Sequence, residues 1–222
     1  MVHALKLWAS SHKLNDPSGA KGPATMSSYC LTLMAIAYLQ HIGHLPNLQA
    51  DINVPEVCRP EDTSEHDVVW VSWGKEQGVK AHVGFSLSPP DDWKPSIPNL
   101  TAADAIRGFF EFFSLNGSAP LRGEKFDRLT QIVSILQGGI VPRAKERGLK
   151  RKKEWERGTE AYQPRNWGEK KLVVQDPFLW FKNCAGMMSR EGLDRWWTTV
   201  DNTHRVMKLK GKNFTLADLL ML

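Results

Sequence analysis

The chain has 222 residues, 41% of them hydrophobic, and a formal net charge of +5, so it can bury a substantial core as one large domain or as one domain with a subdomain. Its longest apolar run, 26–39, is too short to span a bilayer, and the N-terminus lacks a signal-peptide pattern. The three cysteines have no paired spacing, which fits a reducing compartment and argues against a zinc site. These features predict an intracellular protein, in the cytoplasm or nucleus, with no membrane partner.

The first half of the chain predicts two helices and a long connection. The segment 3–14 is a helix that ends at the turn-forming sequence NDPSG. A second helix is predicted over 25–41, and because it is apolar on nearly every face it should lie at the centre of the core. The proline-rich stretch 45–100 is expected to form an irregular connection with one short strand or helix.

The second half predicts more helices and a little β-structure. A helix over 101–115 has Thr101 as a plausible N-cap. The β-branched sequence 126–139 ends in Gly-Gly, which predicts a strand in a hairpin, and a second short strand should break at Asp176-Pro177. A helix over 189–209 and a short final helix follow. The predicted fold is therefore mainly α with a small β element.

The start of the second helix has two interpretations. A helix N-terminus presents unpaired N–H groups that suit an anion, and Ser27 and Ser28 lie in that first turn. Tyr29 follows them and offers a flat ring on which a base could stack. A nucleotide would use both features. Alternatively the serines cap the helix and Tyr29 packs in the core, and these residues alone favour this second interpretation.

The positive charge is concentrated in one segment, 143–171, which has eleven Lys or Arg against five Glu. Its balance of +6 leaves −1 for the rest of the chain. One interpretation is contact with the phosphates of single-stranded RNA, mainly through Lys150, Arg151, Lys152 and Lys153, with Trp155 and Trp167 as stacking partners. The other, favoured by charge alone, is a solvated loop.

Several motifs occur in the order and approximate spacing found in one protein family. They are "LKLWASSHKLNDP", "MSSYCLTLMAIAYLQ", "LPNLQ", "GFFEFF", "VSILQGG" and "QDPFLWFKNCAG". Over roughly 2–205 the chain resembles the region after the catalytic domain in template-independent RNA nucleotidyltransferases, the cytoplasmic-type poly(A) polymerases and terminal uridylyltransferases. The resemblance implies a helical substrate-binding domain at 1–115, a poly(A)-polymerase-associated segment at 116–188, and C-terminal helices at 189–222 that pack on the first domain.

The same resemblance implies roles for individual residues. Ser28 would hold the triphosphate of ATP or UTP, Tyr29 would stack on the base, and Lys6 is similar to the family's phosphate-binding lysine. The loop with Asp176, Lys182 and Asn183 matches the family's nucleotide recognition motif. Two positions depart from the pattern: Ser10 stands where a second basic residue is usual, and Lys182 stands where uridine-specific members place a histidine. A lysine donates hydrogen bonds but cannot accept them.

The family's metal-binding carboxylates are missing from the sequence. Phosphoryl transfer of this kind needs Mg²⁺ or Mn²⁺ held by carboxylates, and the family supplies them from a Gly-Ser turn and an Asp-x-Asp pair in an N-terminal domain. No such pattern occurs here. We therefore expect the nucleotide- and RNA-binding part of such an enzyme, inactive alone and dependent on an upstream catalytic domain. The alternative is a non-catalytic RNA-binding or scaffold module derived from the family.

Overall fold

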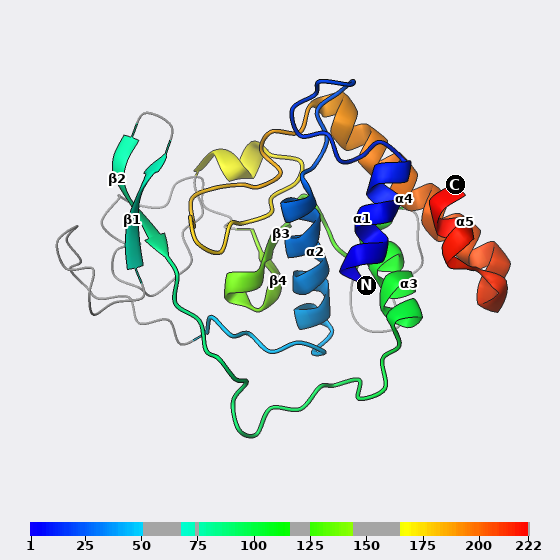
Figure 1. Ribbon diagram of the computed structural model, residues 1–222, viewed down its shortest axis with the longest axis horizontal. Coiled ribbons are helices and arrows are strands. Elements are labelled where there is room, and N and C mark those ends of the chain that lie inside the picture. The colour runs from blue at the N-terminus through cyan, green and yellow to red at the C-terminus, as the bar shows by residue number, and fades with distance from the viewer. Residues whose placement is uncertain (51–67, 74–75, 116–124, 144–164, 222) are drawn as a thin grey trace.

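The computed structural model describes residues 1–50, 68–73, 76–115, 125–143 and 165–221, and shows helices together with two small antiparallel sheets (Figure 1). The helices are α1 (Val2–Ser11), α2 (Ser28–His41), α3 (Ala102–Phe113), α4 (Arg190–Lys210) and α5 (Leu216–Met221). The strands are β1 (Val68–Trp73) and β2 (Glu76–His82), which form one sheet, and β3 (Gln131–Ser134) and β4 (Gly139–Pro142), which form the other. Among the described helices, none has the length and apolarity needed to cross a membrane.

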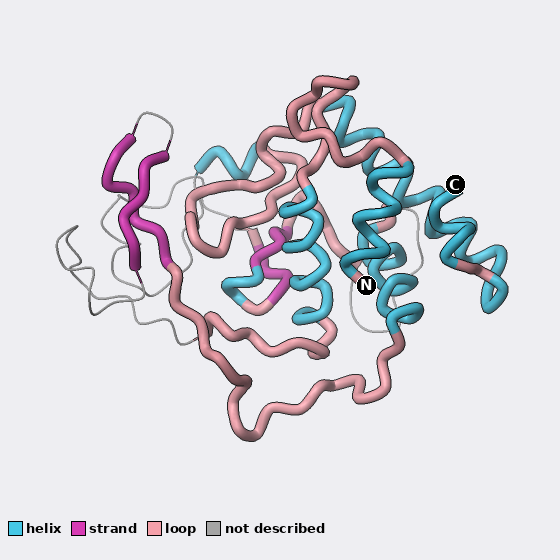
Figure 2. The backbone as a smooth tube through the Cα atoms, in the orientation of Figure 1, coloured by secondary structure: helices cyan, strands magenta, loops and turns pink. Residues whose placement is uncertain are grey.

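Helix α2 lies in the middle of the molecule, as its apolar sequence predicted (Figure 2). It begins at Ser28 rather than at 25, because the Ser27 hydroxyl accepts a hydrogen bond from the amide of Cys30 and caps the helix. Gly139 allows β4 to approach its C-terminal end. A Cβ at Gly139, whose φ is +127°, would lie 2.7 Å from the carbonyl oxygen of Ala37.

An aromatic core joins α1, α3 and α4. The Trp8 ring makes edge-on contacts with Phe110 at 4.8 Å and Trp196 at 5.3 Å between ring centroids, and its Nε1 donates to the Thr203 hydroxyl at 3.0 Å. Thr101 caps α3 as predicted, through the amide of Asp104. The buried face of α3 consists of Ala105, Phe109, Phe110, Phe112 and Phe113, while Ile106 is only partly buried. Burial of such rings contributes the largest share of the apolar stabilisation.

The β-structure differs from the prediction in two places. The strand predicted over 126–139 forms only at β3, and a 3-10 turn at Ile135–Gln137 leads back into β4. The strand predicted before Asp176-Pro177 consists of two isolated bridges, Val133 with Val174 and Gln175 with Asn183. In addition, the connection 45–100 contains a two-stranded hairpin, β1–β2, where one short element was expected. Its strands share one sheet because their facing backbones complete each other's hydrogen bonds.

The basic segment is anchored by a buried arginine. Arg143 is 7% exposed, and its guanidinium donates to the carbonyl oxygens of Trp167 at 2.9 Å and Lys170 at 2.6 Å. Trp167 itself is 2% exposed and packs with Ile132 and Val173. The prediction that Trp167 stacks on RNA is therefore wrong, because the ring belongs to the core. Trp155 and the four basic residues at 150–153 lie outside the described residues.

Candidate functional site

Tyr29 lies at the surface in the first turn of α2. Its side chain is 41% exposed, whereas Cys30 and Leu31, the next two residues, are fully buried. The interpretation in which Tyr29 packs wholly inside the core does not fit this exposure. Ser28 precedes it as the first residue of the helix, and among the described residues no side-chain hydrogen bond engages the Ser28 hydroxyl. Ser28 and Tyr29 therefore both lie in the first turn of α2.

The carboxylate of Asp176 is the centre of the loop beside Tyr29. It is 3% exposed, and its Oδ1 accepts hydrogen bonds from the amides of Phe178 at 2.9 Å and Leu179 at 3.1 Å. Its Oδ2 lies 3.1 Å from Nζ of Lys182 and 3.5 Å from Sγ of Cys184. Four groups of the loop therefore bond to this one carboxylate. Asp176 therefore organises the loop and fixes a negative charge below the tyrosine.

The electrostatics of this cluster follow from burial and from Asp176. Burial, the Asp176 carboxylate and its hydrogen bond with the phenol raise the pKa of Tyr29, so its hydroxyl stays protonated at neutral pH and can donate to Asp176. Burial and the same carboxylate raise the pKa of the Cys184 thiol, and burial raises the pKa of Cys30 to about 12. Both thiols are therefore protonated and unreactive at neutral pH.

Lys182 is the cation of the cluster. Its side chain is 29% exposed, compared with 5% for the side chain of Asp176 with which it pairs. The ion pair holds the ammonium close to the carboxylate while part of the side chain reaches solvent. The arrangement places a cation next to a partly exposed aromatic ring.

Asn183, by contrast, is turned toward the backbone of its own loop. Its Oδ1 accepts from the amides of Val174 at 2.9 Å and Ala185 at 3.0 Å, and its Nδ2 donates to the carbonyl oxygen of Leu172 at 3.0 Å. These contacts hold the loop closed. In this conformation the amide supports the loop, and the predicted contact with a base would need it to leave these partners.

The structure thus gathers only part of the predicted site. Tyr29, Asp176 and Lys182 come together, and Ser28 adjoins them on α2. Lys6 lies half-buried on α1, and no hydrogen bond or ion pair in the described residues joins it to the cluster. The four basic residues at 150–153 fall outside the described residues.

Three supporting contacts were missed by the sequence reasoning. Trp180, within the same loop, is stacked on His82 of β2 with ring centroids 3.7 Å apart. Its carbonyl oxygen accepts from Nε2 of Gln175 at 2.9 Å, and the Ser134 hydroxyl donates to Oε1 of that glutamine at 2.7 Å. No local pattern signals the His82–Trp180 and Ser134–Gln175 contacts, because they join segments far apart in the chain.

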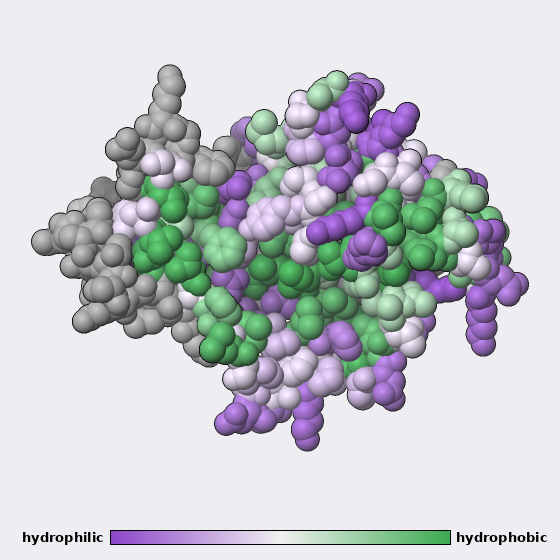
Figure 3. All heavy atoms as spheres, in the orientation of Figure 1, coloured by the Kyte–Doolittle hydropathy of each residue, from purple (hydrophilic) through white to green (hydrophobic). Residues whose placement is uncertain are grey.

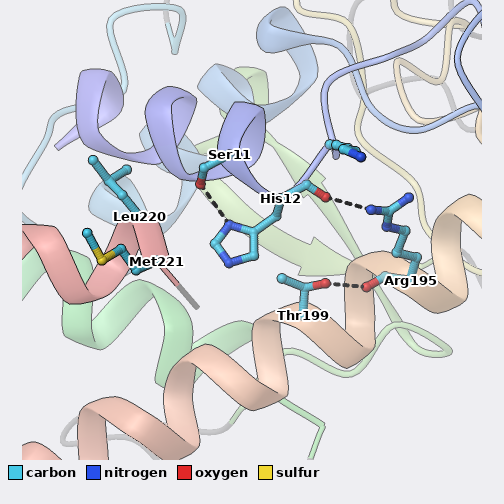
Figure 4. A pocket seen from close by; sticks show the side chains of 7 residues that line it. Ser11, His12, Arg195, Thr199, Leu220 and Met221 are labelled. Carbon is cyan, nitrogen blue, oxygen red and sulfur yellow. Dashed lines mark hydrogen bonds between the residues drawn. The ribbon is translucent and has the colours of Figure 1, made fainter.

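A separate pocket of about 390 Å³ lies between α1, α4 and α5 (Figure 4). Its lining residues are Ser11, His12, Lys13, Arg195, Thr199, Leu220 and Met221. The polar groups are largely bonded to one another: Nη2 of Arg195 donates to the carbonyl oxygen of His12 at 3.0 Å, and the Thr199 hydroxyl donates to the carbonyl oxygen of Arg195 at 2.8 Å. The first contact joins the end of α1 to α4, and the second lies within α4. None of the predicted site residues lines the pocket.

In the part of the chain that the structure describes, no three His, Cys, Asp or Glu side chains are grouped as metal ligands. The described residues therefore do not fit the Mg²⁺ or Mn²⁺ that the family resemblance implies for catalysis.

Comparison with known proteins links the chain to polymerases that make poly(A) and poly(U). No family model matches it. Poly(A) RNA polymerase gld-2 homolog B of Drosophila melanogaster is 28% identical over 181 residues, which cover 80% of this chain and 10% of that protein. Poly(A) RNA polymerase GLD2 of Rattus norvegicus is 25% identical over 182 residues, covering 80% of this chain and 27% of that protein. The chain spans less than a third of these relatives.

Solved structures show the fold. A mutant of the Cid1 poly(U) polymerase bound to MgATP matches with a TM-score of 0.61 and 21% identity, over 99% of this chain and 53% of that one. A cytoplasmic RNA terminal U-transferase matches with a TM-score of 0.55 and 20% identity, over 99% of this chain and 56% of that one. The chain therefore has the fold of about half of such a polymerase, and the two comparisons together support a relationship to RNA nucleotidyltransferases.

Proposed function

We propose that this chain is the nucleotide- and RNA-binding part of a template-independent RNA 3′-terminal nucleotidyltransferase of the poly(A) polymerase or terminal uridylyltransferase type. The observation that carries the proposal is the half-exposed ring of Tyr29 at the start of α2, with Asp176 and Lys182 beside it. The similarity to poly(A) RNA polymerases supports the same assignment.

In this proposal the base of ATP or UTP stacks on Tyr29. Stacking on an aromatic ring contributes about 1 to 3 kcal/mol per base and tolerates any base. The bond from the phenol to Asp176 fixes the ring plane before the ligand arrives, which lowers the conformational entropy lost on binding. The triphosphate would extend toward the N-terminus of α2, where Ser28 and the helix dipole favour an anion, and Lys6 on α1 would add charge from the neighbouring helix.

Lys182 would then contact the edge of the base. Its ammonium can donate to a base carbonyl such as O4 of uracil, and it cannot accept a hydrogen bond from an exocyclic amine. Asp176, buried and already bonded to its own loop, acts by holding Lys182 and Tyr29 in place. Asn183 would support the loop from its other end. This donor-only edge is compatible with loss of strict uridine selection.

The remaining parts of the activity are proposed to lie outside the described site. The basic residues at 150–153 would contact phosphates of a single-stranded RNA 3′ end, and an upstream catalytic domain would supply the carboxylates that hold Mg²⁺ or Mn²⁺. The division into 1–115, 116–188 and 189–222 and an intracellular location belong to the same proposal. A non-catalytic RNA-binding or scaffold module is the competing function.

Nucleotide binding by the 222-residue chain separates the two functions. In calorimetry the wild-type chain should bind UTP and ATP. The affinity should be about 5- to 150-fold lower in Tyr29→Ala, as expected for the loss of one stacking contact. Tyr29→Phe is the matched control, because it keeps the aromatic ring and loses only the hydroxyl. Equal binding by the wild type and Tyr29→Ala would reject the proposed site and leave the scaffold function.

A further inference from the structure

The β1–β2 hairpin ends against the candidate base-binding loop. The amide of His82, the last residue of β2, donates to the carbonyl oxygen of Phe178 at 2.9 Å. Val68, which pairs with His82 across the hairpin, is fully buried, and His82 is 1% exposed. Figure 1 shows the hairpin at one side of the molecule, with the loop after residue 172 extending toward it. One end of the hairpin is therefore fixed on the loop.

The contact is mainly a ring stack. The imidazole of His82 lies nearly parallel to the indole of Trp180, at an interplanar angle of 15° and a centroid distance of 3.7 Å. Among the residues that the structure describes, neither ring nitrogen of His82 has a hydrogen-bond partner. The polar atoms of the imidazole thus add nothing to the contact, and its flat face and its backbone amide make the connection.

Trp180 is held on its other side by the central sheet. Its carbonyl oxygen accepts from Gln175, which is bonded to Ser134 at the end of β3. Its Nε1 donates to the carbonyl oxygen of Pro177 at 3.2 Å, within the loop. Asp176 and Lys182 flank this tryptophan, and the amide of Asp176 donates to the carbonyl oxygen of Lys182 at 3.0 Å. Movement of Trp180 would therefore change the position of both charged groups.

We infer that His82 is a positioning residue for the candidate base site: stacked on Trp180 and bonded to Phe178, it holds the loop so that Lys182 and Asp176 keep their place beside Tyr29. This inference rests on the proposed function, and it adds an element from outside the loop that sets base recognition. The rest of the hairpin has a different surface: Val69 on β1 and Val83, Phe85 and Leu87 after β2 are exposed, where Figure 3 shows apolar residues.

The loop itself provides a test that needs no ligand. The amides of Phe178, Leu179 and Lys182 are hydrogen bonded within the loop, so their hydrogen exchange reports its opening. Loss of an aromatic pair predicts exchange about 2- to 10-fold faster in His82→Ala, and rates close to wild type in His82→Phe, which keeps a flat ring. Val69→Ala is the matched control, because it shortens an exposed side chain of the same hairpin. Unchanged exchange in His82→Ala would overturn the inference.

Binding then tests the link to base recognition. The probes are UTP, ATP and inorganic triphosphate, and the readout is how much more tightly the chain binds the nucleotides than the inorganic ion. That advantage should fall about 2- to 10-fold in His82→Ala, remain in His82→Phe and Val69→Ala, and leave affinity for the inorganic ion unchanged. A wild type with no such advantage rejects the proposed function. A wild type that has it, together with a His82→Ala variant that keeps it, rejects the positioning role alone.

Discussion

The stability of the folded chain should depend on pH through His82. Burial, followed by the nearby charge of Lys80, lowers the pKa of His82 from 6.5 to about 3. The unfolded chain therefore takes up the proton first as the pH falls. The contribution of neutral His82 is fully present above pH 6.5 and is lost between pH 6.5 and about 3.

The size of the effect follows from the two pKa values. Each pH unit inside this window changes the free energy of unfolding by about 1.4 kcal/mol. Between pH 7 and pH 5 the unfolded state gains most of a proton while the folded state gains almost none. The resulting loss is about 2 kcal/mol, enough to raise the opening equilibrium of the segment that exposes His82 about 30-fold.

Urea unfolding of the wild type and of His82→Phe, each at pH 7 and pH 5, isolates the contribution of His82 to the pH dependence of the free energy of unfolding. Burial also lowers the pKa of His41 and His204. Because the wild type and His82→Phe both contain these residues, their contributions cancel when the pH dependences of the two proteins are subtracted. The wild type should lose about 2 kcal/mol more than His82→Phe on going to pH 5. The same loss in both proteins would show that His82 is not buried in its neutral form.

Three further results are expected. Replacing Arg143 with Met removes the guanidinium from the carbonyl oxygens of Trp167 and Lys170 and should lower the free energy of unfolding by about 3 kcal/mol. Urea unfolding measures this loss, with Arg190→Met at an exposed position as the control, and a loss no larger than the control's would be inconsistent with the bonded geometry. Gly139→Ala should lower the free energy of unfolding by more than about 2 kcal/mol, because its Cβ would lie 2.7 Å from the carbonyl oxygen of Ala37 and the φ is +127°. The thermal unfolding midpoint reports this loss. Gly168→Ala is the control, because nothing lies within 4 Å of a Cβ there. Changing the four basic residues at 150–153 to Ser should weaken the binding of single-stranded RNA about equally for all sequences. It should also reduce the slope of log affinity against log salt concentration by about 0.7 per lost phosphate contact. Unaltered affinity and slope would indicate a solvated loop.

Local sequence signals predicted the helices well. Ser27 and Thr101, the capping side chains that the sequence offered, do cap α2 and α3, and Ser189 caps α4 in the same way. These are interactions across three residues, so they can be derived without tertiary structure. The central place of α2 followed in the same way from its all-round apolarity.

The errors came from contacts between distant segments. Trp167 looked like an exposed ring within a charged stretch, but it is drawn into the core beside Ile132 and Val173 while Arg143 is bonded to its carbonyl oxygen. The hairpin β1–β2 was missed because proline-rich flanks hid two short alternating strands. The stacking of His82 on Trp180 joins residues almost a hundred positions apart, and no periodicity encodes it.

The candidate site was predictable only in part, and for a related reason. The resemblance selected Tyr29, Asp176 and Lys182, and the structure brings these three together. The resemblance could not show that the Asp176 carboxylate accepts hydrogen bonds from the backbone of its own loop. Nor could it show that the Asn183 amide is bonded to Val174, Ala185 and Leu172. Roles of that kind depend on side-chain direction, which the sequence does not specify.

The measurement that tests the central claim most directly is an intermolecular nuclear Overhauser spectrum of the chain with UTP, repeated with ATP. If the base stacks on Tyr29, the ring protons of this tyrosine should show cross-peaks to H5 and H6 of uracil, or to H2 and H8 of adenine, and these should vanish in Tyr29→Ala. Cross-peaks from the bases to other aromatic residues, with none to Tyr29 at a ligand concentration that saturates binding, would contradict the account.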